Sequence, residues 1–181
     1  ITFIIPIYNV LAVVALESFR SNGKVRPMAL VKGIVTNPLI LAAVLGMLVL
    51  LSGLRFPAVL EDTIADLASV ATPLALVVLG GSFAIGSVKG NLRPLTIGLV
   101  GRLLVMPALF LPFGVLLGFR GPELLGLMVM LGAPTAVSSY TMAQQMGGDS
   151  ELAGELVVFG TMLSVATIFL WTFLLKSLGY L

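Results

Sequence analysis

Apolar stretches of helix length follow one another along the chain, and short polar segments separate them. Each of the longer stretches approaches the roughly 20 apolar residues that a helix needs to cross a bilayer. The pattern therefore predicts an all-α integral membrane protein. The predicted apolar helices cover residues 1–16, 39–51, 67–85, 95–119, 124–146 and 152–178.

The fifth apolar stretch runs into a polar segment, Gly132 to Asp149, where hydrocarbon-facing sequence should continue. Pro134 removes a backbone donor and disrupts the helix around it. Non-helical backbone at membrane depth is tolerated only inside protein or against a water-filled cavity, and a broken helix there is typical of a transporter's binding site. The alternative is a Pro-kinked helix packed with small residues. The segment carries hydroxyl and amide side chains: Thr135, Ser138, Ser139, Thr141, Gln144 and Gln145.

Composition supports the membrane assignment and excludes several kinds of chemistry. Residues are 59% hydrophobic and 10% charged, whereas a soluble domain is nearer a quarter charged. The chain has no cysteine and no histidine, so it offers no disulfide, no Cys/His or Ser/His catalytic pair and few metal ligands. No Walker motif is present. We expect no enzyme activity, no metal and no cofactor. The net charge of +2 is spread over loops, which argues against a nucleic-acid partner.

Basic residues predict the topology. One set of alternate loops carries most of the lysines and arginines, and the positive-inside rule makes that set cytoplasmic. The C-terminus then lies outside. The predicted cytoplasmic set is Arg20, Lys24, Arg26, Lys32, Lys89 and Arg93, and the predicted outer set is Arg55, Arg120 and Lys176.

Arg102 is a charged residue predicted to lie within the membrane. It follows Arg93 by nine positions, which is roughly 14 Å along a helix. An intramembrane charge is a functional hypothesis by default and needs a partner, for which we name Glu155 first and Asp149 second. Arg102 would either attract an anion or gate its path; alternatively, it would snorkel or join two helices through Glu155.

Several short motifs occur in a fixed order over nearly the whole chain. They are Tyr8-Asn9-Val10, Asn37-Pro38-Leu39-Ile40 with Gly46, Pro73-Leu74-Ala75-Leu76 with Leu79-Gly80-Gly81-Ser82, Arg102-Leu103 with Pro107, and Ala133-Pro134-Thr135-Ala136 with Ala143-Gln144 and Gly147-Gly148-Asp149. Together they resemble the auxin efflux carrier family of permeases, which includes plant PIN-type carriers and bacterial malonate-type transporters.

The resemblance implies a fold of ten helices in two inverted five-helix repeats and an elevator mechanism. This chain, residues 1–181, would be a fragment holding the fifth to the tenth helix. Residues 33–87 would form scaffold-like helices, while 1–17 and 92–181 would be transport-domain-like, with a broken crossover helix at 132–142. The family's pocket uses a second crossover, which would precede Ile1.

These inferences give a candidate site. Free amides of a half-helix beginning near Ser138 or Ser139 would hold a carboxylate. The alternative is that the hydroxyls bond back to their own helix. Asn9 and Gln144 would line the path, or make ordinary interhelical hydrogen bonds. The candidate substrate-binding residues are Asn9, Pro134, Thr135, Ser138, Ser139, Tyr140 and Gln144, and the candidate charge or gating residues are Arg102, Asp149 and Glu155.

The leading hypothesis is a secondary active or potential-driven transporter of a small organic anion, a carboxylate, using elevator-type alternating access. Proton coupling could run through Asp149 or Glu155. The alternatives are a sodium-coupled organic anion symporter of similar crossover fold, and a non-transporting anion-binding membrane sensor or scaffold. We expect a protein of the bacterial inner membrane, in contact with lipid. The family resemblance also implies a homodimer that forms through the scaffold helices.

Overall fold

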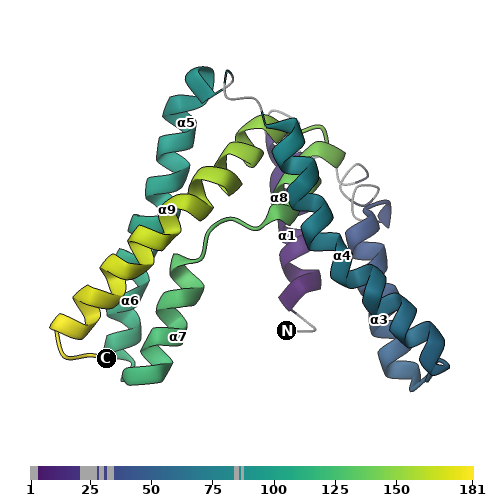
Figure 1. The fold of residues 1–181 in the computed structure, drawn as a ribbon, viewed down its shortest axis with the longest axis horizontal. Coiled ribbons are helices and arrows are strands. Elements are labelled where there is room, and N and C mark those ends of the chain that lie inside the picture. The colour runs from purple at the N-terminus through teal and green to yellow at the C-terminus, as the bar shows by residue number, and fades with distance from the viewer. Residues whose placement is uncertain (1–3, 21–27, 29–30, 32–34, 84–85, 87) are drawn as a thin grey trace. The chain divides into compact units, whose positions relative to one another are not determined.

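Every regular element in the described part of the chain is a helix (Figure 1). The structure is a computed structural model that describes residues 4–20, 28, 31, 35–83, 86 and 88–181. The prediction of an all-α chain is confirmed for these residues. The helices are α1 (Ile4–Arg20), α3 (Pro38–Ser52), α4 (Ala58–Ser82), α5 (Val88–Val100), η1 (Gly101–Val105), α6 (Met106–Leu116), α7 (Gly121–Gly132), α8 (Val137–Gln145) and α9 (Ser150–Ser177).

Four helical spans in the described residues are long and apolar enough to cross a membrane. They are Ala58–Ser82, Val88–Leu116, Gly121–Gln145 and Ser150–Ser177. The second span starts earlier than the predicted 95, because Val88 to Arg93 forms the first turns of α5 rather than a loop. The third span contains the interruption between α7 and α8.

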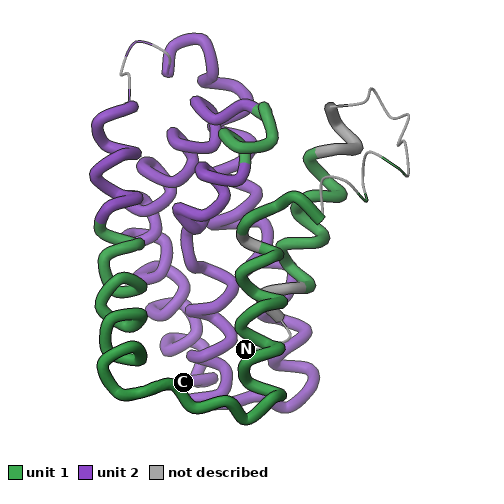
Figure 2. Tube along the Cα trace, turned by 90° about the vertical axis from the view of Figure 1, so that its right-hand side faces the viewer, with its two compact units in different colours: residues 1–73, 143–148 green, residues 74–142, 149–181 purple. Residues whose placement is uncertain are grey.

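The chain divides into two compact units (Figure 2). Unit 1 comprises residues 1–73 and 143–148, and unit 2 comprises residues 74–142 and 149–181. The assignment of 33–87 as scaffold-like and of 1–17 and 92–181 as transport-domain-like stays a prediction.

In unit 1, α1 packs against α3. The start of α3 is set by Asn37, whose Oδ1 accepts a hydrogen bond from the Ile40 amide at 3.3 Å. An amide side chain in this position satisfies a donor that the first helical turn leaves open. Asn37 therefore caps the helix from its N-terminal side. On α1, Val13 is fully buried.

In unit 2, α5 packs against α9, and α6 and α9 pack against α7. Glycines allow these helices to approach closely. A Cβ at Gly98 would lie 2.7 Å from the Leu156 side chain, and one at Gly114 would lie 2.5 Å from Leu127. Small residues in this role are typical of membrane helix interfaces. Among the described residues, one hydrophobic core of this unit consists of Leu111, Leu124, Met128 and Leu175.

The helix from Val88 to Leu116 widens at η1, a π-helical turn. Pro107 follows it and has no N–H to donate to the carbonyl of Leu103, four residues earlier. The indole of Trp171 on α9 donates to that carbonyl at 3.1 Å. A side chain from another helix thus replaces the missing backbone donor, and it ties α9 to η1.

Candidate functional site

The helix predicted at 124–146 is interrupted. Helix α7 ends at Gly132, residues 133–136 are not helical, and α8 begins at Val137. Ala133 is extended, with φ −62° and ψ 139°. The Pro134 ring disfavours a helical conformation for the residue before it, which accounts for this geometry. The interruption predicted from Pro134 is confirmed, and α8 starts one residue before Ser138.

Two hydroxyl groups of α8 bond back to their own turns. Ser139 donates both its amide and its hydroxyl to the carbonyl of Ala136, and the Thr141 hydroxyl donates to the carbonyl of Ser138 at 2.9 Å. The alternative that these hydroxyls serve their own helix is correct for Ser139 and Thr141. Ser138 is exposed, and Thr135 and Pro134 are half-buried.

The first turn of α8 leaves backbone donors open. The first amides of a helix have no acceptor within it and carry the positive end of its dipole. Ser139 finds Ala136, whereas the part of the chain that the structure describes supplies no hydrogen bond to the amides of Val137 and Ser138. The break therefore ends in a site with the polarity that favours an anion.

Arg102 contacts the break from η1. Its Nε donates to the carbonyl of Ala133, the C-cap of α7, at 3.1 Å. A cation at this place also opposes the negative end of the α7 dipole. We predicted Glu155 as its first partner and Asp149 as its second. Among the described residues the structure gives Arg102 a hydrogen bond to this backbone carbonyl, and its pairing with Glu155 or Asp149 stays a prediction.

Glu155 takes part in a hydrogen bond between two helices, and Asp149 caps its own helix. Glu155 is 1% exposed, and its Oε1 accepts a hydrogen bond from the Asn91 amide at 3.4 Å. Asp149 caps α9 by accepting from the Leu152 amide at 2.9 Å. Sequence reasoning missed Asn91 because it lies in the segment 86–93, for which the pattern predicts a loop. Whether Asp149 and Glu155 take part in coupling stays a prediction.

Glycines on α9 bring that helix against the break. The Cβ position of Gly160 lies 3.7 Å from the Pro134 side chain and 4.0 Å from the Thr135 amide nitrogen. Tyr140 is 5% exposed and packs with Leu79 and Val157. It belongs to this local core, and its predicted contact with a substrate stays a prediction.

The two remaining candidates, Asn9 and Gln144, belong to unit 1 rather than to unit 2, which contains the break. Asn9 is 7% exposed on α1, and Gln144 is exposed near the end of α8. Their predicted contact with a substrate stays a prediction. Within the described ranges no group of three acidic, cysteine or histidine residues could hold a metal ion.

Comparison with known protein families finds a match that covers most of the chain. The model of a family described as membrane transport protein matches residues 17–172. No curated protein and no solved structure matches the chain. The matched range includes the break, Arg102, Asp149 and Glu155, and it begins after Asn9.

Proposed function

This chain belongs to the membrane transport protein family, and from that premise we propose that it moves a small organic anion, a carboxylate, across the membrane. Membership confirms the resemblance to auxin efflux carriers and makes the chain part of an integral membrane transporter. Members of this family are transporters, not enzymes. The proposed anion site is the break between α7 and α8.

The observation that carries this proposal is the placement of Arg102 beside the break. Its bond to Ala133 uses Nε alone. A guanidinium has further N–H donors, on its two terminal nitrogens, which match a carboxylate. Four residues beyond Ala133, the amides at the start of α8 add backbone donors of the same polarity. An anion bound at the break would contact both the guanidinium and these amides.

Backbone donors are the main recognition groups in this proposal. The Ser139 and Thr141 hydroxyls already donate to nearby carbonyls, and Ser138 is the exposed hydroxyl of the first turn. Gly160 presents no side chain to Pro134, so the backbone of α9, and not a bulky side chain, packs against the break at that point. A site of this kind accepts carboxylates of different shapes, since the backbone amides bind the carboxylate group and do not select the rest of the anion.

The finer mechanism is carried over from the family resemblance. It comprises an inverted-repeat fold, elevator-type alternating access, a bacterial inner-membrane location with the C-terminus outside, and a homodimer. Transport would be driven by the membrane potential or by protons. Sodium dependence of uptake would instead identify a symporter.

The test is counterflow of labelled dicarboxylates and aromatic acids in proteoliposomes containing the full-length protein. We expect exchange of at least one carboxylate, and a loss of at least tenfold in Arg102→Gln. Arg93→Gln is the matched control, because Arg93 is an exposed arginine on α5, and it should retain exchange. Binding without exchange would identify a sensor. Equal exchange by Arg102→Gln and the native chain would remove the break as the anion site.

A further inference from the structure

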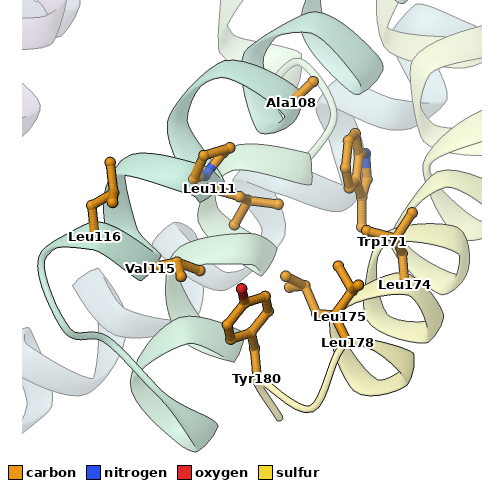
Figure 3. Close-up of a pocket in the computed structure, with 10 residues that line it drawn as sticks. Ala108, Leu111, Val115, Leu116, Trp171, Leu174, Leu175, Leu178 and Tyr180 are labelled. Atoms are coloured by element: carbon orange, nitrogen blue, oxygen red, sulfur yellow. The ribbon is translucent and has the colours of Figure 1, made fainter.

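An apolar pocket of about 420 Å³ lies between α6 and α9 in unit 2 (Figure 3). Its volume is in the range of pockets that hold small molecules. Figure 3 shows α6 side chains on one side of a common space and α9 side chains on the other. The lining residues are Ala108, Leu111, Pro112, Val115, Leu116, Trp171, Leu174, Leu175, Leu178 and Tyr180.

The pocket lies where two membrane-spanning helices end. Helix α6 ends at Leu116 and α9 ends at Ser177. The amide of Gly121, the first residue of α7, donates to the carbonyl of Tyr180 at 3.0 Å, which joins the start of α7 to the segment after α9. Ala108 to Leu116 covers about 12 Å of helix. The space therefore extends from the helix ends toward the hydrocarbon, along the direction that a lipid chain takes.

A cation, Arg120, contacts two of the residues that line this pocket. Arg120 donates from one terminal nitrogen to the carbonyls of Val115 and Phe119, at 2.9 and 2.7 Å. Its guanidinium carbon lies 5.0 Å from the centre of the Tyr180 ring. Val115 and Tyr180 both line the pocket. Arg120 itself is exposed, and within the described residues no carboxylate forms an ion pair with it.

We propose that this pocket is a lipid site that takes one acyl chain of an anionic phospholipid, with the headgroup phosphate on Arg120. The lining is apolar apart from the Tyr180 hydroxyl and the Trp171 N–H, and that N–H already donates to Leu103. A hydrocarbon chain is therefore the ligand that matches this apolar lining. The exposed guanidinium at the mouth selects a negative headgroup over a zwitterionic one. This inference rests on membrane location and is independent of the proposed anion substrate.

Trp171 allows a direct test, because it lines the pocket and is the single tryptophan of the chain. Phospholipids with brominated acyl chains quench tryptophan fluorescence on contact. The full chain is reconstituted in vesicles with brominated phosphatidylglycerol or brominated phosphatidylcholine, and relative binding constants are taken from the quenching curves. We expect phosphatidylglycerol to bind about fivefold more tightly, as one basic residue near the surface provides.

The variants separate charge from fold. Arg120→Gln should remove the fivefold preference, and Arg120→Lys, which keeps the charge, should retain most of it. Arg55→Gln removes an exposed loop arginine elsewhere in the chain and should leave the preference unchanged. An undiminished preference in Arg120→Gln, or equal binding of the two lipids by the native chain, would overturn the proposal.

A second pair of variants tests the pocket itself. Ala108→Phe fills the space from α6 and should weaken quenching of Trp171 by both lipids at least twofold. Ala42→Phe adds the same ring to an exposed position on α3 and should not. Unchanged quenching in Ala108→Phe means that the acyl chain reaches Trp171 from outside the pocket. Absence of quenching in the native chain means that protein covers it. Either result contradicts the assignment.

Discussion

Two neighbouring residues of η1 show how a single position can join helices. Leu103 offers a carbonyl whose helical donor is missing because residue 107 is proline, and Trp171 supplies the donor. Arg102 donates to the carbonyl of Ala133. In both cases one partner is a backbone carbonyl, which every residue carries. The sequence could therefore place Arg102 in the membrane but could not identify its partner.

Trp171→Phe is expected to destabilise the protein by about 1–3 kcal/mol. Phenylalanine lacks the indole N–H, so the Leu103 carbonyl loses its hydrogen-bond donor. Combining it with Pro107→Ala should recover part of this loss, since alanine, unlike proline, provides a backbone N–H four residues after Leu103. Chemical denaturation in detergent measures both variants. If the loss of unfolding free energy in the double variant equals the sum of the losses in the two single variants, the N–H that Pro107 lacks does not explain the contact.

At the scale of elements, the sequence predicted the helix interruption correctly and the start of α5 incorrectly, since that helix begins at Val88 and not at 95. Inside an apolar stretch, a proline such as Pro134 with flanking polar residues indicates an interrupted or kinked helix, and the break occurs there. The segment 86–93 combines glycine with basic residues, which is equally typical of a loop and of a polar first helical turn. Only packing against α9, including the contact of Asn91 with Glu155, distinguishes the two.

Gly160→Leu is expected to disturb the break and to destabilise the protein by about 1–3 kcal/mol through overpacking. A Cβ alone would sit 3.6 Å from Leu99 and 3.7 Å from Pro134, which is ordinary contact, so Gly160→Ala should be tolerated. Gly126→Leu is the control, because its Cβ position has nothing within 4 Å. Thermal unfolding measures all three. Equal stability of Gly160→Leu and Gly126→Leu would contradict close packing of α9 on the break.

For the whole molecule, composition alone was enough to identify membrane helices, because hydrocarbon demands apolar residues whatever the tertiary arrangement. The family match then confirmed the family resemblance that the motifs indicate. Orientation is a separate matter, since it depends on where the basic loops are retained during insertion. It therefore stays a prediction with its own test.

The chain has no cysteine, so single cysteines can report the orientation of its loops. Ser177→Cys should react with a membrane-impermeant maleimide added to intact cells. Lys89→Cys should react only after permeabilisation, because the basic residues around it are predicted to be cytoplasmic. Gel-shift labelling before and after permeabilisation measures the difference. The reverse pattern would invert the topology.

One turn of helix, η1, receives two connections from opposite directions. Leu103 accepts from Trp171, which also lines the apolar pocket, and Arg102 holds the end of α7 at the break. A single peptide bond separates the two. The pocket and the break are thus connected through two hydrogen bonds to one helical turn. If a ligand bound at one of these two places changes the affinity for a ligand at the other through that turn, thermodynamic reciprocity requires the second ligand to change the affinity for the first by the same factor.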